Sequence, residues 1–96
     1  MKNFELVAEI PKLGIVKTDN ALCESETEAL YRARDFGWQL YMEHEGTEEL
    51  PSWDVLAERY HGEWFDLIDS EFERALDDLY VRTIESSVDY WIEEVK

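Results

Sequence analysis

The start of the chain alternates apolar and polar positions, a pattern typical of a half-buried strand. The apolar side chains fall at every second position, so a strand would place them on one face: Phe4, Leu6, Ala8 and Ile10. Residues 11–14 (Pro-Lys-Leu-Gly) form a turn signal, and residues 15–17 resume an extended pattern. The sequence therefore predicts an N-terminal β-hairpin. Because an isolated hairpin is only marginally stable, this one must pack on a helix or gain further strands.

Two helices are predicted next, each from a capping residue. Ser25 and Glu28 have the spacing of a capping box, and apolar residues continue at helical spacing to about Glu43. Ser52 can cap a second, shorter helix that stops at Gly62. Both predictions depend only on local signals.

Gly37 lies inside the first predicted helix, where glycine costs about 1 kcal/mol relative to alanine. We therefore expect the backbone of another element to approach the helix closely at this position.

Helical spacing continues to the C-terminus, but its apolar residues form two stripes more than a quarter-turn apart around the axis. Either the helix bends or breaks within Val81–Ser87, or one straight helix buries different faces along its length. Poor helix formers in that stretch favour the break. Leu79 and Ile84 should be buried in both cases. The predicted fold is α+β: one domain, 1–96, with the hairpin packed on three to four helices and a helix-rich C-terminal half.

The chain carries 24 acidic against 9 basic side chains, a formal net charge of −15. Residues 1–22 are neutral in sum, so the excess lies in residues 23–96. Such a balance nearly excludes direct binding to nucleic acid or to an anionic membrane and favours a basic partner. There is no apolar run of membrane-spanning length and no signal-peptide pattern, so a cytoplasmic location is expected.

Histidine and cysteine, two residue types that often carry catalysis, are scarce. The chain has two histidines, His44 and His61, and one thiol, Cys23, whose acidic neighbours disfavour nucleophilic reactivity. Glu43, His44 and Glu45 could weakly hold a metal, although a solvated helix end explains them more simply. No phosphate-binding loop or nucleophile motif occurs. We expect no enzyme activity, no cofactor and no metal.

Acidic residues recur at helical spacing in two groups. The first group is Asp66, Asp69, Glu73 and Asp77, and the second is Glu85, Asp89 and Glu93. On a helix each group would form a row on one face, where like charges repel by a few tenths of a kcal/mol per pair. A face that only keeps a protein soluble normally mixes Lys with Glu. The single-sign rows therefore predict a surface whose electric field serves binding.

Trp64 and Phe65 are adjacent, so a helix cannot bury both on one narrow stripe. Large rings usually fill the core of a small domain, but exposed ones are frequent anchors of protein interfaces. We expect one of this pair to be such an anchor.

A resemblance points in the same direction. Residues 60–67 (YHGEWFDL) are similar to the His-Gly-x-Trp stretch near the start of ArdA-type anti-restriction proteins. The acid-rich, aromatic-rich composition also resembles the DNA-mimic inhibitors of phages and mobile elements, which include anti-CRISPR proteins. The resemblance implies a stoichiometric inhibitor that blocks the nucleic-acid-binding site of a basic host protein or complex. For a phage-encoded chain, that means the host cytoplasm.

Two other functions fit the same composition. An immunity protein or antitoxin that caps a basic nuclease toxin would need the same acidity. A structural or adaptor protein would need it only for solubility. A homodimer, which would bring the acidic rows of two copies together, also stays open.

Overall fold

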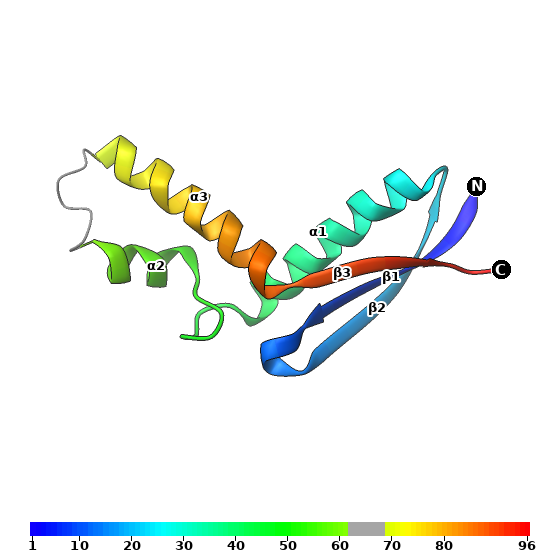
Figure 1. Cartoon of the computed structure of the whole chain (residues 1–96), viewed down its shortest axis with the longest axis horizontal. Coiled ribbons are helices and arrows are strands. Elements are labelled where there is room, and N and C mark those ends of the chain that lie inside the picture. Colours follow the sequence, from blue (N-terminus) through cyan, green and yellow to red (C-terminus); the bar gives the residue numbers. More distant parts are fainter. Residues whose placement is uncertain (62–68) are drawn as a thin grey trace.

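The computed structural model describes residues 1–61 and 69–96, which form a sheet with helices along one side and beyond one end (Figure 1). The fold is α+β, as predicted, and the sheet is antiparallel with three strands. In chain order the described elements are β1 (Lys2–Ile10), the 3₁₀ turn η1 (Pro11–Leu13), β2 (Ile15–Cys23), α1 (Glu26–His44), α2 (Trp53–Tyr60), α3 (Asp69–Ser87) and β3 (Asp89–Glu94).

The predicted hairpin is confirmed. β1 and β2 pair along their whole length, from Lys2 opposite Cys23 at the open end to the turn. Gly14 closes the turn with a φ of 64°, a left-handed conformation that a residue with a Cβ adopts only at a cost. Its N–H donates to the Pro11 carbonyl at 3.2 Å.

The chain ends in a strand, and the prediction of a helix up to the C-terminus is wrong. β3 runs antiparallel to the second edge of β1, with Trp91 opposite Val7. The strand order is β2-β1-β3, so β1 is central. Four of the five residues 88–92 are β-branched or aromatic, and such side chains favour a sheet when a partner strand is available. The C-terminal half is accordingly less helical than predicted.

The helix was predicted to bend or break within Val81–Ser87, and α3 ends at Ser87, the last residue of that stretch. Ile84 is fully buried as expected, whereas Leu79 is only half-buried. After the helix, the side chains that face the core have the alternate spacing of a strand: Val88 is buried and Ile92 is half-buried. The second apolar stripe therefore passes from a helix into a strand: Tyr80 and Ile84 lie on α3, whereas Trp91 and Ile92 lie on β3.

α1 covers one face of the sheet and forms the main core with it. The contacting side chains are buried: Phe4, Leu6, Ala8 and Ile10 from β1, and Ala29, Ala33, Leu40 and Tyr41 from α1. The predicted Ser25 cap is confirmed, since Ser25 Oγ accepts from the Glu28 N–H at 3.2 Å. The second bond of the capping box differs, because Glu28 Oε2 accepts at 2.8 Å from the N–H of Glu24, one residue before the N-cap.

Gly37 is a point of close approach, as predicted. A Cβ at this position would lie 2.9 Å from Val88 Cγ1 and 3.7 Å from Tyr90 Cβ. The expectation of an approaching backbone is wrong in one respect, because these nearest atoms belong to side chains. Glycine lets α1 lie directly against β3.

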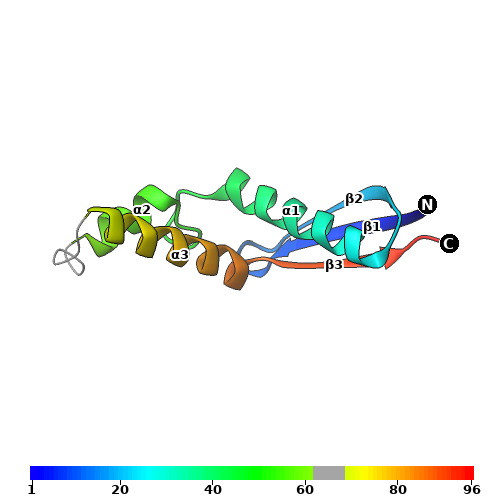
Figure 2. The same ribbon diagram turned by 90° about the horizontal axis from the view of Figure 1, so that it is seen from above.

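α2 and α3 pack on each other beyond the end of the sheet (Figure 2). Leu56 and Leu76 are buried there. Ser52 caps α2 as predicted, with its Oγ accepting from the Val55 N–H at 3.3 Å, and α2 ends at Tyr60. The molecule measures 55 × 26 × 15 Å, with a radius of gyration of 16.2 Å against about 12.5 Å for a compact chain of this length. The protein is elongated because α2 and α3, together called the helical arm below, extend beyond the sheet (Figure 2).

Candidate acidic interaction surface

One face of the sheet has no described helix on it. α1 packs on the opposite face, and α2 and α3 extend beyond the strand ends (Figures 1 and 2). Because side chains alternate along a strand, the register assigns the residues of the uncovered face. These are Asn3, Glu5, Val7 and Glu9 of β1, Val16, Thr18, Asn20 and Leu22 of β2, and Asp89, Trp91 and Glu93 of β3. We call its four carboxylates, with Val7 and Trp91 between them, the acidic sheet face.

The carboxylates of the acidic sheet face oppose one another. Glu5 lies opposite Glu93, and Glu9 lies opposite Asp89. Cβ atoms of such cross-strand partners are about 5 Å apart, and like charges at this separation destabilise a sheet. The repulsion occurs twice, on either side of the central Val7–Trp91 pair.

No basic side chain of the described strands relieves this repulsion, because the register places no Lys or Arg on the uncovered face. The ion pairs of the described residues lie on the α1 side of the sheet or on the helices. They are Lys2–Glu94, Lys17–Glu43, Arg32–Glu28, Arg34–Glu85 and Arg82–Asp78. The four carboxylates therefore direct an uncompensated negative field toward solvent.

Trp91 supplies an exposed ring in the middle of this field. Its side chain is 38% exposed, whereas Val7 opposite is only 4% exposed although no described helix lies over it. An indole flanked by carboxylates can hold an arginine or lysine both by cation–π contact and by charge.

The first predicted acidic row lies partly outside the described residues. Asp66 falls within 62–68, and of Asp69, the first residue of α3, only the backbone is described. Glu73 and Asp77 are exposed and one turn apart on α3. Asp77 also has a structural contact, since its Oδ1 accepts a hydrogen bond from Trp53 Nε1 at 2.9 Å and ties α3 to α2.

The second predicted row is wrong as a single helix face. Glu85 is on α3, with its Oε1 3.3 Å from Arg34 Nη2, while Asp89 and Glu93 are on β3. A spacing of four keeps two residues on one face of a strand as well as of a helix. In the strand, however, their Cα atoms are about 13 Å apart, not about 6 Å. Their cross-strand partners on the same face are the glutamates of β1.

Four residues of the acidic sheet face were not predicted: Glu5, Val7, Glu9 and Trp91. A signal for the glutamates was present, because both alternate with the apolar residues of β1 and so must lie on its other face. The neutral sum of residues 1–22 concealed it. Trp91 lies where the sequence predicted a helix up to the C-terminus, and the proposed anchors Trp64 and Phe65 lie outside the described residues.

Other chemistry is sparse in the described part of the chain. There, no three His, Cys, Asp or Glu side chains come together as metal ligands. The Cys23 side chain is fully buried, and His61 packs edge-to-face on Phe72 with centroids 5.8 Å apart. None of the described helices is long and apolar enough to cross a bilayer.

Two tyrosines bond to the segment that connects α1 to α2. Tyr41 donates to the Pro51 carbonyl at 2.6 Å, and Tyr80 donates to Glu45. Burial, with the nearby Glu45 charge, raises the pKa of Tyr41 to about 12. Burial also raises the pKa of Tyr80, and the hydrogen bond to Glu45 and its charge add to the shift. Both phenols stay protonated at neutral pH and act as structural donors.

No protein-family model, curated protein or solved structure matches this chain. The function has therefore to be inferred from the surface itself.

Proposed function

We propose that the protein is a stoichiometric inhibitor that blocks the nucleic-acid-binding site of a bacterial defence complex, of the CRISPR or restriction type, by presenting an acidic surface in place of nucleic acid. The observation that carries this proposal is the acidic sheet face. Its two carboxylate pairs cost folding free energy and receive no compensating base from the described strands. A chain that needed acidity only for solubility could place the same charges apart.

The shape and charge of the whole chain support the proposal. A net charge of −15 over a length of 55 Å is about one charge per 3.7 Å. A nucleic acid strand carries about one charge per 3.4 Å of axis, and a duplex about one per 1.7 Å. The average density is therefore that of one strand, which favours a target site that grips a single strand.

The central ring gives the surface a second function in binding. Charged surfaces accelerate encounter, whereas a buried aromatic anchor mainly slows dissociation. On the acidic sheet face, the carboxylates would steer a basic site onto the surface and Trp91 would pack against its lysine or arginine stems.

The sharpest test reverses two charges of the face. In the double variant Asp89→Lys/Glu93→Lys, each lysine lies opposite a glutamate of β1, so the four charges of the face sum to zero. Cross-strand pairs of opposite charge stabilise a sheet, so the fold should survive. The matched control is Glu48→Lys/Glu49→Lys, in the exposed loop before α2. Both variants have a net charge of −11.

The readout is phage plating on bacterial strains that each carry one defence system. The wild type and the loop control should protect phage in at least one strain, and the sheet variant should not. With that purified complex, the sheet variant should associate about tenfold more slowly than the control at physiological salt, because steering depends on local charge. Equal activity of the two variants would refute a function for the acidic sheet face. Wild-type inactivity across all strains would refute the inhibitor proposal.

A further inference from the structure

β3 has an outer edge that the described strands leave unpaired. The sheet order places β3 at one side, bonded only to β1. The Val95 N–H donates to the Asn3 carbonyl at 2.9 Å. Because hydrogen-bonding positions alternate along an antiparallel strand, the N–H and C=O groups of Tyr90, Ile92 and Glu94 must point away from β1. Three consecutive outward positions form a template for one more strand.

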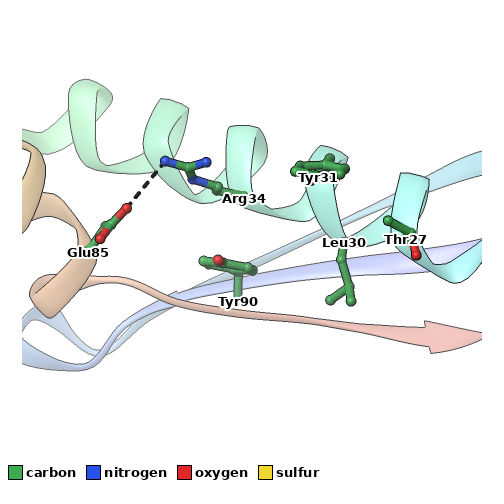
Figure 3. A pocket seen from close by; sticks show the side chains of 6 residues that line it. All are labelled: Thr27, Leu30, Tyr31, Arg34, Glu85 and Tyr90. Atoms are coloured by element: carbon green, nitrogen blue, oxygen red, sulfur yellow. Dashed lines mark hydrogen bonds and ion pairs between the residues drawn. The ribbon is translucent and has the colours of Figure 1, made fainter.

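A groove of about 570 Å³ runs beside this edge, between α1 and β3 (Figure 3). Leu30 and Tyr31 of α1 and Tyr90 of β3 line it, with exposed fractions of 45%, 65% and 38%. Figure 3 shows Tyr90 rising from the strand toward α1 and the Arg34–Glu85 ion pair at one end. A cluster of large exposed side chains beside an open strand edge is a feature of interaction sites.

The opposite edge of the sheet differs. The groove between α1 and β2 has a similar volume, about 530 Å³, but the described residues that line it include no tyrosine and mix apolar with polar side chains, among them Leu6, Leu22 and Phe36 with Asp19, Arg32 and Asp35. Among the described strands, β3 is the edge strand whose outward backbone groups lie beside a groove lined by exposed tyrosines, Tyr31 and Tyr90, which suit alternate apolar residues of a peptide.

We propose that the β3 edge binds an extended segment of a partner protein as a fourth strand, and that this segment alternates basic with large apolar residues. Side chains of an added strand alternate between the two faces of the sheet. On one face they would enter the groove against Tyr31 and Tyr90. On the other face they would lie beside Asp89 and Glu93, which recognise lysine or arginine.

Charge also selects this occupant over a second copy of the chain. Pairing two β3 strands would bring together two surfaces that each carry Asp89, Glu93 and Glu94, in molecules that each have a net charge of −15. Like charges on paired strands are destabilising. A basic segment gains from the same charges.

The test uses the full-length protein and a short synthetic peptide in which Lys alternates with Tyr and Val. A peptide of identical composition, with its lysines in one block and its apolar residues in another, controls for unspecific attraction. The alternating peptide should bind at least tenfold more tightly by fluorescence anisotropy. It should also slow hydrogen exchange at the Tyr90, Ile92 and Glu94 amides, as measured by NMR.

Tyr31→Ala should weaken binding about tenfold, as loss of an interface aromatic typically does. Met42→Ala is the matched control, because Met42 is 48% exposed on the same helix but outside the groove. Equal binding of the two peptides, or protection at β2 amides instead, would overturn the proposal. So would a dimer in sedimentation whose β3 amides are protected without peptide. No defence complex enters this assay, so its outcome is independent of the proposed inhibition.

Discussion

Replacing Gly37 by alanine tests the packing of α1 on β3, the contact that sequence patterns did not predict. Two effects oppose each other. Alanine gains about 1 kcal/mol over glycine inside a helix. Its Cβ, however, would lie 2.9 Å from Val88 Cγ1, well inside the usual carbon–carbon contact of about 3.5–4.0 Å.

The size of the steric clash decides whether Gly37→Ala stabilises or destabilises the fold. Val88 is 5% exposed and β-branched, so it has little freedom to move away. Overpacking of a core by one methyl group costs about 1–3 kcal/mol. Gly37→Ala should therefore destabilise the protein by about 1 kcal/mol net, against the direction that helix propensity alone predicts.

Val88→Ala provides the decisive background. It removes Cγ1 and should itself cost about 2 kcal/mol through lost burial. The next atom near the Cβ introduced by Gly37→Ala would be Tyr90 Cβ at 3.7 Å, an ordinary contact. Gly37→Ala should then stabilise by about 1 kcal/mol, which gives a coupling of about 2 kcal/mol in a double-mutant cycle. Urea unfolding followed by circular dichroism measures all four proteins. The same sign for Gly37→Ala in both backgrounds would refute the α1–β3 contact.

Two further predictions concern the helical arm and the segment that connects it to α1. Tyr41→Phe leaves the Pro51 carbonyl without its donor and should cost about 1–3 kcal/mol at pH 7 in urea unfolding. Because the pKa of Tyr41 is raised in the folded protein, the wild type should lose stability as pH rises from about 10 toward 12. Tyr41→Phe should lose less stability over this range. If Tyr41 were instead exposed to solvent, the two proteins would lose the same amount. Asp77→Ala removes the acceptor of Trp53 Nε1 and should cost about 1 kcal/mol, whereas Glu73→Ala on the same face should be neutral; equal effects would show that the bond contributes nothing.

The parts of the fold that the sequence predicted correctly depend on neighbouring residues. The hairpin turn needs one residue in the left-handed conformation, and Gly14 occupies that position. Helices that need a side-chain acceptor at their N-terminus start after Ser25 and Ser52. Alternation over residues 4–10 was sufficient to identify the buried face of β1.

β3 could not be predicted in this way, because its apolar residues fit both periods. Val88, Trp91, Ile92 and Val95 have helical spacing, whereas Val88, Tyr90 and Ile92 have strand spacing. The open edge of β1 decides between them, and that edge is remote in sequence: Glu9 pairs with Asp89, 80 residues later. A local pattern contains no information about a partner so distant.

Two residues of the predicted second acidic row share a face in the structure, but on a strand, and this changes the test of the predicted site. Asp89 and Glu93 share a face in either structure, because four residues complete a whole number of strand periods and nearly one helical turn. On a helix, lysine at these positions would mainly relieve repulsion along one row. In the sheet, each lysine instead gains a cross-strand glutamate, worth about 0.2–1 kcal/mol per pair. The double lysine variant should therefore be more stable than the wild type by urea unfolding and yet lose the inhibition that we propose. A gain in stability coupled to a loss of activity is expected only where the wild-type repulsion is retained for binding.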